Sequence, residues 1–258
     1  AKAIWSSIIA DTAVAADERI FAAFDYAWVL RAEGRFRESL QPLLTLETEI
    51  REERIREPLA LATLALSHME LGESDTALQL AAQALASNQA SSPARYLFTR
   101  GLIELQQQGS DAVTRTIAEL RALSASDEQT DRKEHRAAAH LEGLLLLVEG
   151  KSAEAVSRLE AAGTITGYDY AILELSLAKA LQAAGQFDRA LEYAVKAANY
   201  HDPAEVRLDL QLDRVRAVLL QAELQDRLGN SEQARQLAER FLQQWQQADM
   251  PHRDLESL

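Results

Sequence analysis

The tripeptide Gly150-Lys151-Ser152 has the ending of a phosphate-binding loop, in which backbone amides and a lysine hold phosphate groups. Such a loop needs a glycine five residues earlier, where this sequence has Leu145. It also needs a preceding strand, whereas residues 141–148 have the apolar pattern of a helix. The sequence therefore excludes a phosphate loop. We expect Ser152 to cap a helix instead, like the serines two residues after Gly72 and Gly229.

His135 and His140 are the next residues that could do chemistry, as metal ligands. Five residues separate them by roughly 140° around a helix, so they cannot chelate one ion from the same face. The chain has no HExxH motif, no Ser/His/Asp grouping and no cysteine, which excludes disulfides and thiolate chemistry. We therefore predict no catalytic, cofactor-binding or metal-binding residue.

Residues 171–198 form the clearest structural element, two apolar patterns separated by Gly185. Just past a helix end, glycine adopts the left-handed conformation without steric cost, so the chain can reverse there. The stretch is predicted to be a helix hairpin, in which the small side chain of Ala190 lets two helices approach closely. The positions with helical spacing are Leu177, Ala178 and Leu181 before the glycine, and Leu191, Ala194, Ala197 and Ala198 after it.

The same frame recurs along the chain, at glycines 34, 72, 109, 150, 185 and 229. Phe36 follows Gly34, and an alanine stands five residues after each of the glycines at 72, 150, 185 and 229. With Phe187 and the apolar positions around Gly185, this pattern resembles the tetratricopeptide repeat, although its spacings exceed the family's period of about 34 residues. The resemblance covers roughly residues 20–245. It implies an all-α right-handed superhelix, a solenoid of about six helix hairpins.

Residues 1–258 are expected to form a single helical-repeat domain, in which residues 1–16 are a capping helix and the hairpins turn near the six glycines. A formal charge of −13 disfavours nucleic acid and anionic membrane as partners, because both need a surplus of Lys and Arg. The longest apolar run, residues 144–148, is too short to cross a bilayer. We expect a soluble protein of the bacterial cytoplasm or periplasm. Because the chain opens on Ala1, we also expect a processed chain or a piece of a larger protein.

Three expectations concern single elements. Pro42 fits the first turn of a helix better than its interior. The charged run of residues 47–57 is predicted to continue that helix outward into solvent. Asp202-Pro203-Ala204-Glu205 has the pattern of a capping box and is predicted to open a long helix that ends at Gly229.

The repeat frame also predicts a binding surface. In the tetratricopeptide family the concave face is lined by first-helix positions two, five and nine, and the resemblance transfers these positions to a mixed apolar and charged groove. An extended peptide or a helix could place apolar groups there, while the basic members pair with acidic groups. The alternative is that the apolar members pack inside the protein. The predicted groove residues are Tyr96, Thr99, Ile103, His140, Leu144, Ile172, Leu175, Lys179, Arg216 and Leu219.

The sequence thus favours a non-catalytic scaffold that binds a protein or peptide, as the interaction or sensing domain of a larger bacterial regulator or envelope assembly. Two alternatives remain open. One is a small-molecule sensor with its pocket at the helix interruption of residues 163–170, and the other is an α-helical enzyme. The identity of the partner and the oligomeric state do not follow from the sequence.

Overall fold

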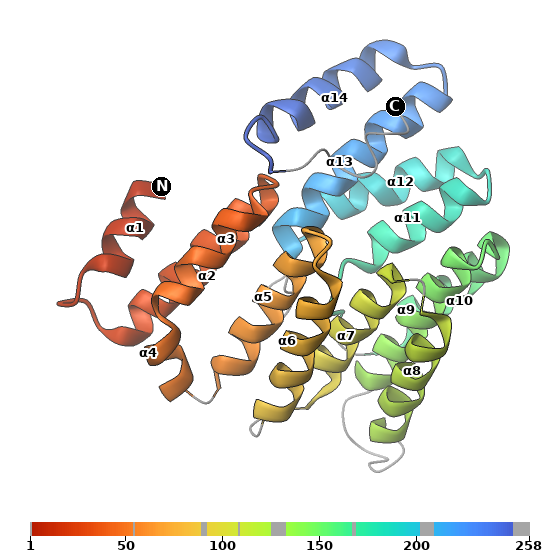
Figure 1. The fold of residues 1–258 in the computed structure, drawn as a ribbon. Helices are drawn as coiled ribbons and strands as arrows, with labels where there is room; N and C mark the ends of the chain where they lie inside the picture. Colours follow the sequence, from red (N-terminus) through yellow and green to blue (C-terminus); the bar gives the residue numbers. More distant parts are fainter. Residues whose placement is uncertain are drawn as a thin grey trace. The chain divides into compact units, whose positions relative to one another are not determined.

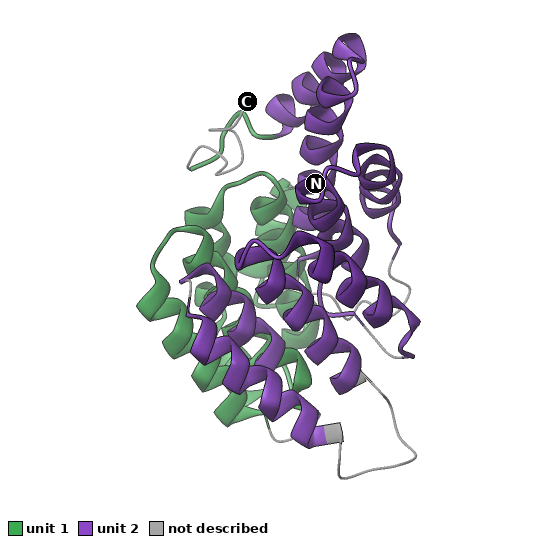
Figure 2. Cartoon of the chain, turned by 90° about the vertical axis from the view of Figure 1, so that its right-hand side faces the viewer, with its two compact units in different colours: residues 1–96, 245–258 green, residues 97–244 purple. Residues whose placement is uncertain are grey.

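The computed structural model describes residues 2–53, 55–88, 92–107, 109–124, 133–166, 169–201 and 209–249. These residues form fourteen α-helices and no strand (Figure 1). The chain divides into two compact units: residues 1–96 with 245–258 are unit 1, and residues 97–244 are unit 2 (Figure 2). The all-α fold class is therefore confirmed, whereas the single domain stays a prediction.

Unit 1 consists of a short helix followed by two helix hairpins. The short helix packs on the first hairpin, where the rings of Trp5 and Tyr26 stack with centroids 6.0 Å apart. Phe24, Leu43 and Leu46 belong to the core of this unit and are 2% exposed or less. Its helices are α1 (Lys2–Ala10), α2 (Ala16–Ala32), α3 (Phe36–Thr45), α4 (Glu47–Glu52), α5 (Glu57–Glu70) and α6 (Ser74–Ser87).

Unit 2 contains four helix pairs. The alanines of its third pair, Ala190, Ala194 and Ala197, have no exposed surface, because neighbouring helices pack directly on their methyl groups. The helices are α7 (Ala94–Gln106, which begins in unit 1), α8 (Ser110–Ser124), α9 (Lys133–Val148), α10 (Ser152–Thr164), α11 (Leu173–Ala183), α12 (Phe187–Ala198), α13 (Leu210–Arg227) and α14 (Ser231–Gln244).

A left-handed glycine reverses the chain in five of the hairpins. At Gly185, φ is 72°; the glycine N–H donates to the carbonyl of Gln182 at 3.0 Å, and the next N–H, of Gln186, donates to Leu181 at 2.9 Å. These two bonds satisfy carbonyls that the helix end would leave without partners. The same pair of bonds occurs at the glycines 34, 72, 150 and 229.

Three local expectations were wrong. Ser74 and Ser152 are the first residues of α6 and α10 and not their N-caps. The N-cap residues are Glu73 and Lys151, and neither helix has a side-chain hydrogen bond at its cap. Pro42 lies inside α3 rather than in its first turn. The last long helix begins at Leu210, since Asp209 has a non-helical backbone, and the proposed capping box at residues 202–205 lies outside the described residues.

Candidate functional site

An open pocket of about 500 Å³ lies within unit 1. Leu43, Ile50 and Leu64 are buried at its apolar surface, whereas Leu44 is 44% exposed and available for contact. We call this site the α3–α6 pocket, after the first and last of the four helices that line it. The lining residues are Leu43, Leu44, Glu47, Ile50, Arg51, Glu57, Ala60, Leu61, Leu64, Leu80, Gln83, Ala86 and Ser87.

The pocket depends on a break in the helix after Thr45. Leu46 leaves the helical conformation, with φ −107° and ψ 22°, and the chain then forms the short helix α4. Leu46 and Ile50 are 0% and 4% exposed, so burial of their side chains holds α4 against the core of unit 1. The prediction that the charged run simply continues the preceding helix was therefore wrong, although Glu47 and Arg51 are exposed as expected.

The charged groups of the pocket lie in its solvent-accessible part. Glu47 and Arg51 form an ion pair one helical turn apart, with 59% and 67% of their side chains exposed. Such an exposed pair contributes little to stability and can rearrange around a ligand. Glu57 lies in the first turn of α5. Most of the lining is apolar, so the chemistry of the site suits binding of apolar side chains.

The structure places the predicted groove residues mainly in the interior. Three of them, Leu144, Lys179 and Arg216, are partly exposed. Their apolar companions pack within the protein, as the alternative interpretation expected, and partner binding along this groove stays a prediction. The buried members are Tyr96, Thr99, Ile103, His140, Ile172, Leu175 and Leu219, each 5% exposed or less.

His140 makes a contact within unit 2 that resembles catalytic machinery. Its Nε2 atom lies 2.7 Å from the hydroxyl oxygen of Ser176, and its ring centroid lies 5.2 Å from that of Phe98. A serine and a histidine at this distance can act as nucleophile and base. His140 and Ser176 are 1% and 8% exposed, so a substrate does not reach them in this structure. The hydrogen bond between the two side chains therefore satisfies two buried polar groups.

The interruption between α10 and α11 is held by an arginine. Arg136 forms a bidentate ion pair with Asp169, in which the Nη2–Oδ2 distance is 2.8 Å. It also donates to the carbonyl of Ile165 at 2.7 Å. Because Arg136 is engaged by the protein itself, it is a structural clamp in this conformation. Residues 167–168, part of the suggested sensor pocket, lie outside the described residues.

Two features are absent from the described residues. No cluster of three or more His, Asp or Glu side chains could hold a metal ion among them. Within the same residues, no helix combines the length and the apolar character that crossing a bilayer requires.

These features define a helical-repeat protein built from α-hairpins, with an open pocket between two consecutive hairpins of unit 1. Comparison with known families identifies the repeat: residues 58–83 and 215–240 match the tetratricopeptide repeat. The matches fall on the hairpins α5–α6 and α13–α14, whose alanines Ala77 and Ala234 are buried as the frame requires. The predicted resemblance is therefore confirmed.

One solved structure supports the same fold, and a second is similar to this chain in sequence. A tetratricopeptide repeat protein from Parabacteroides merdae is 16% identical, with a TM-score of 0.54, over 94% of this chain and 83% of that one. The pilF protein of Pseudomonas aeruginosa is 19% identical, with a TM-score of 0.45, over 90% of this chain and 96% of its own. A comparison with curated protein sequences gave no significant match.

Sequence reasoning missed the α3–α6 pocket. Its signal was the presence of Leu43, Leu44, Leu46 and Ile50 within and beside a charged run. Apolar residues at this density indicate that one face of a charged helix is covered. The pocket also needs Leu61 and Leu80 from the next hairpin, and their proximity follows only from the packing of the two hairpins.

Proposed function

We propose that this chain is a non-catalytic scaffold that binds a protein or peptide partner, and that the α3–α6 pocket takes apolar side chains of that partner. Tetratricopeptide repeats generally serve protein interaction, and one of the two matched segments lies on the pocket's own hairpin. The observation that carries the proposal is an open, mainly apolar cavity of about 500 Å³ with a half-exposed leucine, Leu44. Such cavities are typical places for anchor side chains.

We further propose that this scaffold works as the interaction or sensing part of a larger bacterial regulator or envelope assembly. The support is the repeat architecture, which presents surfaces for other chains, together with the mainly apolar lining of the pocket. The acidic balance of the whole chain, −13, favours neutral or basic partners over nucleic acid.

The test uses peptides selected from a random displayed library on the full chain. We expect the enriched peptides to contain apolar anchors, and Leu44→Asp to weaken their binding at least tenfold, because it places a charge in the apolar cavity. The matched control is Val195→Asp, which changes a 42% exposed side chain on α12, outside the pocket. Unchanged binding to Leu44→Asp, or equal losses in the two variants, would contradict the pocket as the site.

A further inference from the structure

The first hairpin turn of unit 1 holds a segment from the end of the same unit. The indole N–H of Trp245 donates to the carbonyl oxygen of Ala32 at 3.1 Å. Its ring meets Phe36 edge to face, with centroids 6.0 Å apart and an interplanar angle of 73°. Trp245 is only 7% exposed, so the turn recognises the indole by both a hydrogen bond and an aromatic contact.

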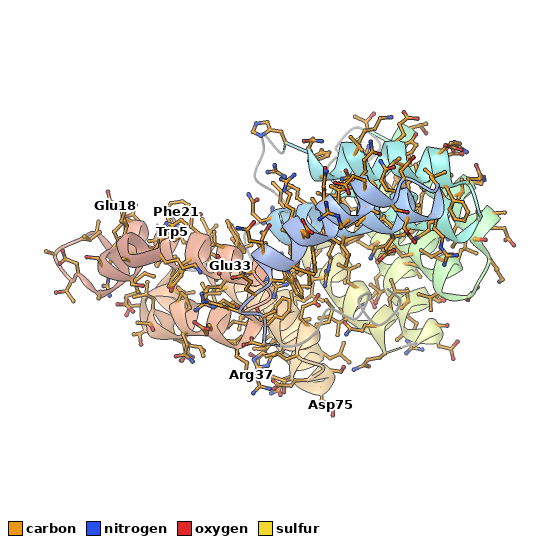
Figure 3. All side chains as sticks on the ribbon, turned by 90° about the horizontal axis from the view of Figure 1, so that it is seen from above. Trp5, Glu18, Phe21, Glu33, Arg37 and Asp75 are labelled. Carbon is orange, nitrogen blue, oxygen red and sulfur yellow. The ribbon has the colours of Figure 1, made fainter. Side chains whose placement is uncertain are left out.

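The rest of the segment is recognised through backbone groups. The N–H of Asp249 donates to the carbonyl of Gly34 at 2.9 Å. Its carboxylate accepts from the backbone N–H of Arg37, labelled in Figure 3 near the start of α3. A Cβ atom at Gly34 would lie 2.7 Å from the Cβ of Ala248, so the absence of a side chain there makes room for the segment. The turn thus binds a tryptophan, a small residue three positions after it, and a hydrogen-bonding residue at the next position. We call a turn that binds such a segment an acceptor.

The turn at Gly185 in unit 2 repeats this acceptor. Its sequence, residues 183–187, is Ala-Ala-Gly-Gln-Phe, against Ala-Glu-Gly-Arg-Phe at residues 32–36. The glycine φ angles are 72° and 73°. The residues that follow, Gln186 and Arg35, have ψ angles of 64° and 62°. The backbone therefore takes the same course at both turns, which places Ala183 and Phe187 at the backbone positions of Ala32 and Phe36.

The second acceptor is open. A Cβ atom at Gly185 would meet no other atom within 4 Å. Ala183 is exposed and Phe187 partly exposed, whereas their counterparts Ala32 and Phe36 are buried. The other left-handed turns, at glycines 72, 150 and 229, lack both the alanine and the phenylalanine, so the resemblance is specific to this pair.

We propose that the Gly185 turn is a second acceptor, which binds a tryptophan-anchored peptide segment supplied by another protein chain. The tryptophan donates to the carbonyl of Ala183 and packs on Phe187, and a small residue three positions later covers Gly185. The fourth position differs, because Asp188 stands where the first turn has Arg37. Its carboxylate repels an aspartate, so an uncharged residue such as asparagine fits better there. This site goes beyond the α3–α6 pocket and does not depend on it.

The experiment measures binding of the peptide acetyl-LQQWQQAN-amide to the full chain by fluorescence anisotropy. The peptide repeats residues 242–249 with asparagine in place of Asp249. We expect it to bind the wild type, to lose binding when its tryptophan becomes alanine, and to bind severalfold more tightly than the aspartate version. Gly185→Asn should weaken binding at least tenfold, since asparagine tolerates the left-handed backbone but fills the open space.

Gly150→Asn is the matched control, because it makes the same change at an open left-handed turn without the aromatic residue. Ala183→Arg is a second blocking variant that leaves the glycine intact. No binding to the wild type at millimolar peptide would overturn the proposal. Equal losses in the two asparagine variants would also overturn it, as would full binding to Ala183→Arg. Binding of the library-selected peptides to Leu44→Asp, which tests the α3–α6 pocket, is measured separately. The two proposals can therefore fail independently.

Discussion

At the scale of single residues, Asp213 in unit 2 has a strongly perturbed pKa. It lies on α13, is 9% exposed, and accepts the backbone N–H of Ile172 at 3.2 Å, at the start of α11. Burial, together with a smaller effect of the nearby Asp209, raises the pKa of its carboxyl to about 6, whereas Arg216, the hydrogen bond from Ile172 and Lys179 act in the opposite direction. A buried carboxylate with so little compensation opposes folding at neutral pH.

We predict that Asp213→Asn raises the unfolding free energy at pH 7, by about 3 kcal/mol at most. Between pH 3.8 and 6 the native carboxyl binds more protons than the unfolded one, so wild-type stability falls as pH rises through this window. The side chain of Asp213→Asn carries no charge, so this loss of stability disappears. Its amide oxygen still accepts the hydrogen bond from the backbone N–H of Ile172. Thermal melts from pH 4 to 8 measure the difference, which should shrink towards zero near pH 4. The exposed Asp188→Asn serves as control, and a pH-independent loss of stability in Asp213→Asn contradicts the argument.

At the scale of elements, α9 and α10 approach closely at Gly143. A Cβ atom there would lie 2.5 Å from Cγ of Leu159 and 2.6 Å from its Cδ2 atom. Leu159 has no exposed surface, so it has no free space to move into. The missing side chain therefore sets how near the two helices pack.

Gly143→Ala is expected to destabilise the protein by up to about 2 kcal/mol. Overpacking against Leu159 costs about 1–3 kcal/mol, and the better helix propensity of alanine returns about 1 kcal/mol. Gly163→Ala is the matched control, because its Cβ would make an ordinary contact 3.5 Å from Leu173. Chemical denaturation measures both variants; a Gly143→Ala protein as stable as Gly163→Ala would show that Leu159 can yield.

The connection between α10 and α11 depends on the clamp formed by Arg136 and Asp169. Asp169 is 5% exposed, so Asp169→Asn should cost about 3 kcal/mol by leaving a largely buried guanidinium without its carboxylate. Glu192→Gln, which breaks an exposed pair with Lys196, should leave the melting temperature unchanged. Calorimetry of the two variants separates the effects, and similar melting temperatures would argue against the clamp.

The elements show which parts of the fold are encoded locally. The turn at Gly185 could be predicted because a left-handed residue and the apolar spacing on both sides are properties of neighbouring residues. The α3–α6 pocket could not, because it requires a helix break at Leu46 and the approach of Leu61 and Leu80 from the next hairpin. The same limit applies to the predicted groove, whose exposure depends on how the helices pack. Apolar positions such as Ile103 and Leu175 serve packing or binding equally well in a repeat frame, and only burial distinguishes the two.

At the scale of the whole molecule, unit 1 is built from two stretches far apart in the sequence. The stretch that begins at Trp245 belongs to it together with residues 1–96, and residues 245–249 cover its first hairpin turn. The stability of this hairpin therefore depends on residues at the other end of the chain.

We predict that Trp245→Ala destabilises unit 1 by about 3 kcal/mol, because it removes a large buried aromatic side chain. Hydrogen exchange should then accelerate at the amides of residues 31–40, around the uncovered turn. Leu242→Ala, at a side chain that is 51% exposed, should leave their protection unchanged. Unaltered exchange in Trp245→Ala would mean that the turn is stable without its covering segment.

The discontinuity of unit 1 also bears on biosynthesis. A ribosome that adds 5–20 residues per second needs roughly 7–30 s to proceed from residue 96 to residue 245. During that interval the nascent amino-terminal hairpin exposes the rim around Gly34, with the ring of Phe36 beside it. The order of translation thus leaves an aromatic surface open to chaperones until residues 245–249 have emerged and cover it.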